Sequence, residues 1–275
     1  MRRTKDSRYK VKAVFFDILA ECRELKKELS DAGIIVFVPF FGLQMEQTLK
    51  GILADTQVSA EQCLLLTNKE QHGKVARSLG MAVAGCVEGH FEVPKNVTLL
   101  ETPEEVSVHY LDMIYCHMQK LPAVIAETHS CIIREMTEDD FDALYELLAD
   151  SETAKYLQEK PESKAVEQEK LRSYVHYVYS FFGYGYWGVF SKASGELIGR
   201  AGFKEGEYPL EAGYVIKRSE WGKGLATEVL TELVRYAKEE LACTEIYATI
   251  DENNIASLCV ARKCGILCNR LRNNS

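Results

Sequence analysis

The first half of the chain alternates short apolar runs with stretches in which apolar residues recur at helical spacing. Apolar runs of strand length lie at 11–19, 34–40, 62–68, 81–87 and, more weakly, 96–102. Helical patterns lie at 21–33, 43–54, 69–79 and 103–120. In the last of these, Glu104 and Glu105 are placed to favour the positive end of the helix dipole. Strands that alternate with helices predict βαβ units and a Rossmann-like, mainly parallel sheet, which is an α/β domain.

The second half of the chain follows a different pattern. The expected elements are, in order, a short strand and a helix capped at Thr137 (131–150), a polar helix (162–181), two antiparallel strands around a Ser-Gly turn (185–203), a third strand (210–216), a helix (226–241), a strand (245–250) and a last helix (253–266). An antiparallel meander that changes to alternating strands and helices predicts an α+β domain. The segment 121–130 has no clear period, so we place the boundary there and predict two domains, 1–125 and 130–275.

Composition narrows the class of protein. The chain is 47% hydrophobic and 27% charged, as in globular proteins, and its apolar runs are far shorter than the ~20 residues that cross a bilayer. The basic start lacks a sustained apolar segment, so we expect no signal peptide and no membrane partner. Nine cysteines without paired spacing favour reduced thiols, a cytoplasmic location and no metal site. A net charge of -8 argues against a general nucleic-acid partner.

The stretch SEWGKGLATEVL, residues 219–230, carries the first sign of chemistry. A strand precedes it, and a long helix follows directly after Gly222 and Gly224. The first amides of a helix have no partner within the helix, and the helix dipole adds partial positive charge there. Glycines allow a left-handed backbone and close approach of a ligand. The stretch is therefore either a simple turn or a cradle for phosphate oxygens.

Three motifs favour the cradle. The segments YGYWGVFSKASGELIGRAGF, LEAGYVIKRSEWGKGLATEVL and DENNIASLCVARKCGI stand in this order over residues 131–266. Together they resemble the GNAT superfamily of acetyl-CoA-dependent N-acetyltransferases, and most of all its ribosomal-protein N-terminal acetyltransferase branch. The resemblance implies a GNAT fold and acetyl transfer to a primary amine, on a small molecule or a protein N-terminus, with acetyl-CoA as co-substrate and no metal.

The resemblance also implies roles for individual residues. In the phosphate loop, Trp221 stands where the family often has Gln or Arg. The residues implied to bind the carrier's pyrophosphate through their backbone amides are Gly222, Lys223, Gly224, Leu225 and Ala226, with added charge from Lys223. The residues implied to pair with the pantetheine arm, sheet-fashion, are Tyr214, Val215 and Ile216. Asn254 matches an asparagine that hydrogen-bonds the same arm, although it could simply cap the last helix.

Transfer requires a base for the amine and support for the departing thiolate. Glu211 occupies the strand position where the family often places its base, and a water chain is the alternative. Ser257 matches a serine that supports the thiolate, or it is a local polar residue of the helix. The family's tyrosine acid has no counterpart, because Ala261 stands in its place. Tyr186 and Trp187 are expected to lie in the core.

The end of the chain departs from the GNAT pattern. The fold continues through two strands after its last helix, whereas LCNRLRNNS leaves room for at most one. We therefore predict that the last strand is missing and that the open sheet edge is covered, by another copy in a homo-oligomer or by the first domain.

The first domain resembles haloacid-dehalogenase-like phosphatases in the segments VFFDIL and CLLLTNKEQHGKVARSLGMAVAGCVEG. Asp17 stands at the place of their nucleophile, but Leu19 replaces the second aspartate. Thr67 and Asn68 replace the acids of the last motif, so magnesium would have few ligands. The resemblance therefore implies a degenerate relative in which Asp17 is simply a strand-end residue.

Three functions remain open from the sequence. The first is an N-acetyltransferase. The second is a regulatory module that binds acyl-CoA without turnover, which the missing tyrosine, the short C-terminus and the decayed first domain favour. The third is an active phosphatase in the first domain, which the missing magnesium ligands argue against.

Overall fold

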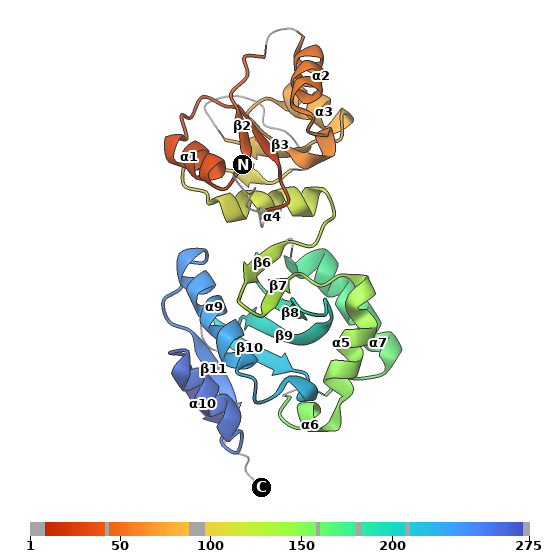
Figure 1. The fold of residues 1–275 in the computed structure, drawn as a ribbon, viewed down its shortest axis with the longest axis vertical. Helices are drawn as coiled ribbons and strands as arrows, with labels where there is room; N and C mark the ends of the chain where they lie inside the picture. The colour runs from red at the N-terminus through yellow and green to blue at the C-terminus, as the bar shows by residue number, and fades with distance from the viewer. Residues whose placement is uncertain are drawn as a thin grey trace. The chain divides into compact units, whose positions relative to one another are not determined.

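A computed structural model of the chain describes residues 9–41, 44–87, 97–157, 160–179, 183–206 and 210–271 (Figure 1). The chain divides into two compact units, residues 1–123 and 124–275. Each unit is built around one sheet, five-stranded in the first and seven-stranded in the second. Within the described ranges, no helix is long and apolar enough to span a membrane.

The first unit is a parallel α/β sheet, as predicted. Its strands are β1 (Ala13–Asp17), β2 (Ile35–Phe37), β3 (Cys63–Thr67), β4 (Ala82–Cys86) and β5 (Leu99–Leu100), and its helices are α1 (Arg23–Asp31), α2 (Met45–Thr56), α3 (Glu70–Ser78) and α4 (Val108–Met118). The sheet order is β2-β1-β3-β4-β5, and all neighbouring strands are parallel. β1, β3 and β4 are buried along their whole length, which explains their continuous apolar sequences.

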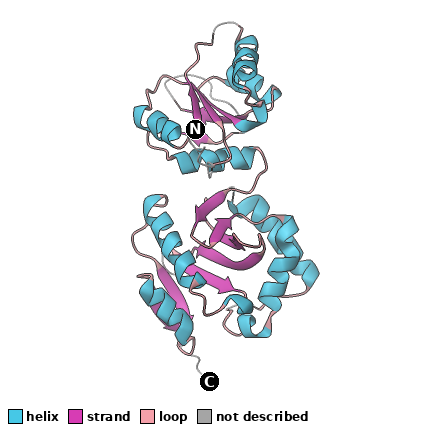
Figure 2. Ribbon diagram, in the orientation of Figure 1, coloured by secondary structure: helices cyan, strands magenta, loops and turns pink. Residues whose placement is uncertain are grey.

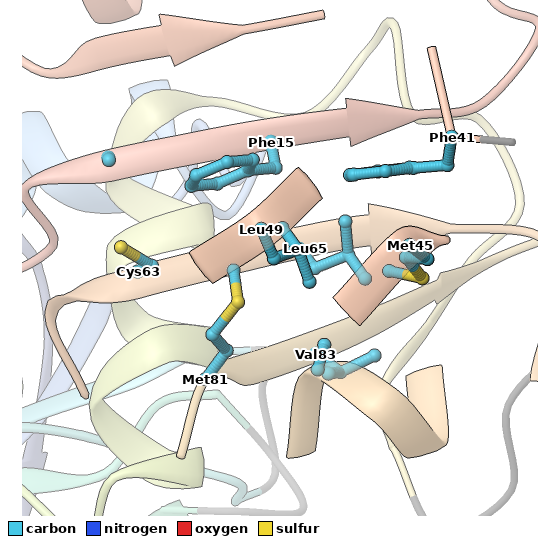
Figure 3. Packing of buried hydrophobic residues seen from close by; sticks show 10 residues of the cluster. Phe15, Phe41, Met45, Leu49, Cys63, Leu65, Met81 and Val83 are labelled. Carbon is cyan, nitrogen blue, oxygen red and sulfur yellow. The ribbon is translucent and has the colours of Figure 1, made fainter. Parts of the chain in front are cut away.

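One face of this sheet packs against α2. Phe15, Leu65 and Val83 occupy paired positions on three adjacent strands, so their side chains point to the same side. Figure 3 shows them in one cluster with Met45 and Leu49 of α2. All five side chains are buried, so this cluster forms a core for the first unit that does not depend on the second sheet.

The second unit contains an antiparallel meander followed by parallel strands. Its strands are β6 (Val124–Glu127), β7 (Cys131–Arg134), β8 (Tyr186–Ser191), β9 (Leu197–Lys204), β10 (Glu211–Ile216), β11 (Tyr247–Asp251) and β12 (Leu267–Leu271). Its helices are α5 (Phe141–Ala149), α6 (Ser151–Ala154), α7 (Lys164–Ser173), α9 (Leu225–Glu239) and α10 (Ile255–Lys263). β6 to β10 are antiparallel neighbours, whereas β10, β11 and β12 are parallel.

Helices cover both faces of the second sheet (Figure 2). Trp187 of β8 contacts Phe203 of β9 and Tyr236 of α9, which defines one face. Val215 of β10 packs against the cluster of α5 and α7, which defines the other. The site described below lies where β10 is in contact with both layers.

Two expectations about element boundaries were wrong. The helix expected at 103–120 begins only at Val108, because the Ser107 hydroxyl accepts a hydrogen bond from the Tyr110 N–H (3.0 Å) and caps it. Glu104 and Glu105 therefore precede the helix and do not lie in its first turn. The segment 121–130, which shows no period, contains β6, an edge strand that pairs only with β7 in the described sheet. One strand, β12, follows α10 and pairs in parallel with β11.

Candidate functional site

A glycine-containing loop connects β10 to α9. The Trp221 Nε1–H donates a hydrogen bond to the Ile216 carbonyl (2.7 Å), which ties the loop to the end of the strand. Gly222 and Gly224 have φ angles of +77° and +82°, and a Cβ at either would meet no atom within 4 Å. Glycine is therefore required by the left-handed backbone and not by lack of space.

No side chain of the described residues caps the start of α9. Gly224 is the N-cap residue, and the Glu228 N–H makes a 3.1 Å bond to its carbonyl. The amides of Leu225 and Ala226 precede that bond, so they have no acceptor within the helix. The positive end of the helix dipole lies at the same place, and the loop is thus suited to phosphate oxygens. Lys223 pairs with Glu220 (Nζ to Oε2, 2.9 Å), so its charge is partly neutralised.

β10 and β11 separate directly after their first paired position. Glu211 pairs with Tyr247, and no further pair joins the two strands within the described residues, although β10 stays paired with β9 as far as Ile216. The backbone of Tyr214, Val215 and Ile216 is therefore open on the side toward β11. An extended ligand can pair with such an open strand.

A cavity of about 970 Å³ occupies this opening. Every site residue that the sequence analysis names, except Lys223, lines it: Glu211, Tyr214, Val215, Ile216, Gly222, Gly224, Leu225, Ala226, Asn254 and Ser257. The fold thus brings residues from β10, the glycine loop and α10 to one cavity.

The start of α10 forms the wall opposite β10. The Asn254 side-chain oxygen accepts the Ser257 N–H (3.1 Å) and caps the helix, so only the amide NH₂ of Asn254 is left to donate to a ligand. The Ser257 hydroxyl lies 2.9 Å from the Tyr214 hydroxyl, which crosses from β10. Burial raises the pKa of Tyr214 above its usual range, and the bond to Ser257 offsets part of that shift. A protonated tyrosine therefore lies beside the predicted serine, a pair that the sequence analysis missed.

Glu211 is a buried carboxylate on the first residue of β10, where β10 and β11 begin to separate. It is 7% exposed, and its nearest charged neighbour is Lys204 (Nζ to Oε2, 3.9 Å). No hydrogen bond from the described residues reaches its side chain. The loop at Gly206 passes so close that a Cβ there would lie 2.5 Å from Glu211 Oε2. A carboxylate in this setting can accept a proton from a group in the cavity.

Tyr186 corrects one expectation about the core. Trp187 is buried as expected, but Tyr186 lines the cavity. Burial raises the pKa of Tyr186 to about 12, with Glu211 raising and Arg200 lowering it, so its hydroxyl lies within the influence of both charges. Arg200 and Lys204 also line the cavity and were not identified from the sequence. The alternation of side chains on β8, β9 and β10 is the signal that could have found them.

In the first unit, Asp17 lies at the carboxyl end of β1. Its Oδ2 accepts a hydrogen bond from the Thr67 hydroxyl (2.6 Å) and lies 2.6 Å from His72 Nδ1. Its Oδ1 accepts one from Lys69 Nζ (2.9 Å). Asp17 thus links the ends of β1 and β3 to the first turn of α3. Within the described ranges, no three or more His, Cys, Asp or Glu side chains are grouped to hold a metal ion.

Comparison with known proteins gives a family match within the second unit. Residues 131–266 match the family described as "Acetyltransferase (GNAT) domain". "Uncharacterized N-acetyltransferase YoaA" of Bacillus subtilis (strain 168) is 28% identical over 137 residues, which cover 48% of this chain and 77% of that protein. "Uncharacterized N-acetyltransferase p20" of Bacillus licheniformis is 25% identical over 134 residues, with coverage of 48% and 75%.

Solved structures of acetyltransferases also resemble this part of the chain. A GNAT-family acetyltransferase from Bacillus anthracis is 22% identical with a TM-score of 0.44, over 50% of this chain and 81% of that one. RimL, described as a ribosomal L7/L12 alpha-N-protein acetyltransferase, is 18% identical with a TM-score of 0.46, over 52% and 80%. The family match, together with the N-acetyltransferase relatives, assigns the segment: residues 131–266 form an acetyltransferase (GNAT) domain.

Proposed function

We propose that the second unit transfers an acetyl group from acetyl-CoA to a primary amine by direct attack of the amine on the thioester. The observation that carries the proposal is the open side of β10 leading to the uncapped start of α9 in one cavity. A carrier with a diphosphate at one end and an amide-containing arm at the other matches both features.

The loop amides from Gly222 to Ala226 would hold the diphosphate, and the Tyr214–Ile216 backbone would pair with the arm. The NH₂ group of Asn254 would donate to a carbonyl of the arm, while its oxygen keeps capping α10. These contacts would place the thioester beyond Tyr214, toward Glu211. From the glycine loop to Glu211, the cavity residues would thus contact first the diphosphate, then the arm and then the thioester.

The chemistry requires movement of one proton. A bond forms between the amine nitrogen and the acyl carbon, and the carbon–sulfur bond breaks. Glu211 would take the proton that the amine loses. The sulfur would leave as a thiolate that accepts a hydrogen bond from the Tyr214–Ser257 pair, whose hydroxyls stay protonated near neutral pH because burial raises the pKa of Tyr214. Glu211 would then release its proton to solvent, and the thiolate would take one up. The pair would supply the hydroxyl donor that Ala261 cannot.

Binding of CoA can be tested with a backbone-matched pair of variants. Gly224→Val forces a β-branched residue into φ +82°, so the loop must rearrange and the dissociation constant of CoA should rise at least about 10-fold. Gly195→Val introduces the same conflict at φ +74° in the turn between β8 and β9, away from the cavity, and should leave it unchanged. Isothermal titration calorimetry with CoA measures both, and equal affinity in the two variants would contradict the proposal.

Turnover distinguishes an enzyme from a binding module. Release of free thiol from acetyl-CoA should depend on an added amine and saturate with it. CoA binding without turnover over a broad amine panel would instead support the regulatory module. The panel should include small metabolite amines and N-terminal peptides, because the domain alone does not choose between them.

For the first unit, we propose a degenerate relative of haloacid-dehalogenase-like phosphatases without phosphatase activity. The three donors on Asp17 support this, because a carboxylate so engaged is poorly placed to attack phosphorus. Magnesium-dependent hydrolysis of p-nitrophenyl phosphate, lost in Asp17→Asn, would contradict it. We also propose a cytoplasmic location, since all nine cysteines are present as thiols.

A further inference from the structure

Two cavities meet at the acceptor end of the candidate site. A second cavity of about 300 Å³ lies beside the first and shares with it Leu157, Tyr186 and Arg200. Apolar side chains of α5 and α7, among them Leu144 and Leu171, line its interior. The first cavity, which holds Glu211, therefore continues past Arg200 into this second space.

Strand register places Arg200 and Glu211 on the same face of the sheet. Glu211 pairs with Lys204, Gly213 with Gly202, and Val215 with Arg200. Residues two apart on a strand share a face, so the long side chains of Arg200 and Glu211 flank the side-chain-free positions of Gly202 and Gly213. Arg200 and Lys204 are four residues apart, which separates the two Cα atoms by about 13 Å. Glu211 lies beside Lys204, so a gap of similar length separates Arg200 from Glu211 and has room for a compact acceptor.

Tyr186 forms the floor of this gap. Its hydroxyl lies so close to Gly213 that a Cβ there would be 2.5 Å from it. The guanidinium of Arg200 lies over the Tyr186 ring, with Cζ 4.9 Å from the ring centroid. The ring fixes the guanidinium in the cavity wall through stacking and cation–π attraction, while the edge with its N–H donors is left for another group.

Arg200 makes no direct ion pair with a described carboxylate. Glu167 lies near enough to interact with its charge but pairs with Lys170, and no Asp or Glu of the described residues lies within salt-bridge distance of the Arg200 guanidinium. Arg134, on β7, provides the contrast: it also lies over an aromatic ring, Phe190, but makes two hydrogen bonds to Asp140 (2.9 and 3.0 Å). A half-buried guanidinium beside a cavity, stacked but without an anion, is suited to bind one from a ligand.

The ion pairs around the two cavities leave Arg200 among the cations that have no described carboxylate partner. The described cations that line the two cavities are Lys155, Lys160, Lys170, Arg200, Lys204 and Lys263. The described carboxylates that line them are Glu152, Glu167, Glu211, Glu220 and Asp251. Lys170 pairs with Glu167 and Lys204 with Glu211, whereas Arg200 is in no ion pair with a described carboxylate.

We propose that Arg200 binds a carboxylate of the acceptor, so that the transferase acts on amines that also carry a carboxylate. The proposal rests on the proposed acetyl transfer and deepens it. The amine lies toward Glu211, and the carboxylate accepts two parallel N–H bonds from Arg200. Such an acceptor is either a free amino acid or an acidic protein N-terminus, which share this chemistry.

Matched acceptors test the proposal. Each amino acid is paired with its amide, and each N-terminal peptide with Asp or Glu is paired with its Asn or Gln form. We expect the wild-type kcat/KM to be about 10- to 100-fold higher for the carboxylate member of a pair, since a charged hydrogen bond is lost in the other. Preference among amino acids alone identifies a metabolite acceptor, and preference among peptides identifies a protein acceptor. Equal kcat/KM within every pair overturns the proposal while acetyl transfer stands.

Variants separate recognition from structure. Arg200→Gln should raise KM for the carboxylate acceptors by about 10- to 100-fold and change KM for their amides by less than about 3-fold. Arg200→Lys, which keeps the charge but not the paired donors, should recover part of the loss. Lys238→Gln, at an exposed cation in the last turn of α9 that lines neither cavity, is the matched control and should change little. A parallel loss on both members of each pair overturns the proposal.

Binding gives a readout that does not depend on turnover. Calorimetry with CoA-loaded protein should detect the carboxylate-bearing amine, whereas its amide should bind at least about 10-fold more weakly, and Arg200→Gln should remove the difference. A protein that binds neither CoA nor acetyl-CoA contradicts the proposed function, and the same titration without CoA then decides whether Arg200 prefers carboxylates. Equal affinity for acid and amide in that titration overturns the inference.

Discussion

The two units differ in how they satisfy the polar groups at the ends of their strands: Asp17 is the last residue of β1, and Glu211 is the first residue of β10. In the first unit, Asp17 receives donors from Thr67 and Lys69 and contacts His72, so the polar groups satisfy one another. In the second unit, β10 separates from β11 and leaves backbone groups open, the start of α9 lacks a cap, and no described residue hydrogen-bonds the Glu211 carboxylate. Two buried acids at strand ends thus differ in what is left for a ligand.

This difference indicates which of the two acids is better placed to react with a ligand. Asp17 and Glu211 have the same exposed fraction, 7%, so burial does not distinguish them. Their partners do. Asp17 is in contact with three polar groups and has exchanged its hydration for protein contacts, whereas Glu211 has only the Lys204 ammonium at 3.9 Å among the described residues and can bind a new group. This contrast supports our proposals of a structural role for Asp17 and a chemical role for Glu211.

The largest expected effect comes from Glu211→Gln. The amide keeps the shape of the side chain but cannot accept the amine proton, so kcat/KM for transfer should fall about 100- to 10,000-fold. The dissociation constant of CoA should change by less than about 2-fold, because the carrier contacts lie farther along the cavity. Thiol-release kinetics and calorimetry measure the two quantities. Glu196→Gln, in the exposed turn before β9, is the control, and an equally active Glu211→Gln protein would favour a water chain as base.

A smaller effect is expected on the stability of the first unit. Asp17→Asn removes the charged acceptor of Lys69 and the shared acceptor of Thr67 and His72, which should lower the free energy of unfolding of this unit by about 1.5–3 kcal/mol. Hydrogen exchange of β1 and β3 at increasing urea concentration measures the loss. Asp55→Asn, at the exposed end of α2, is the control and should stay within about 0.5 kcal/mol.

Activity measurements on Asp17→Asn test the comparison of Asp17 with Glu211 a second time. If Asp17 is structural, Asp17→Asn should leave the kcat/KM of acetyl transfer within about 2-fold of wild type. A stable Asp17→Asn protein that loses a separate catalytic activity, such as phosphate ester hydrolysis, would reverse the ranking of the two acids.

The sequence predicts the fold best where burial is complete. β1, β3 and β4 are buried on both faces, so their apolar runs stand out without knowledge of partners. β6 could not be found in this way, since it is a four-residue edge strand whose identity depends on pairing with β7. The start of α4 was misplaced because the Ser107 cap competes with an equally plausible acidic first turn.

The candidate site divides in the same manner. Gly222 and Gly224 could be identified from the sequence, because a left-handed backbone before a helix demands glycine and the surrounding motif is specific. Arg200 and Tyr186 could not, because their approach to Glu211 depends on the register of three strands. The contact of Asp17 with His72 likewise joins residues 55 positions apart, through the parallel pairing of β1 with β3.

The smallest predicted effect concerns Tyr214. Tyr214→Phe removes the hydroxyl that lies 2.9 Å from Ser257 Oγ but keeps the ring, so kcat should fall about 5- to 10-fold, as for one lost hydrogen bond to the departing sulfur. KM for acetyl-CoA should stay within about 2-fold, because the backbone of residue 214 still pairs with the carrier. Single-turnover rates of acetyl transfer measure the change.

A double-mutant cycle tests whether Tyr214 and Ser257 act together or independently. Ser257→Ala alone should cost about as much as Tyr214→Phe, and the double variant little more than either, since the two hydroxyls act as one unit. The pH dependence has a definite sign. Burial raises the pKa of Tyr214 above the usual value of about 10, so the hydroxyl stays protonated at every pH below about 10. The pH–rate profiles of wild type and Tyr214→Phe should therefore have the same shape from about pH 7 to 9. Fully additive losses would contradict the shared role of the two hydroxyls, and so would a fall in rate below pH 9 that only the wild type shows. The contrast with Asp17 would then depend on Glu211 alone.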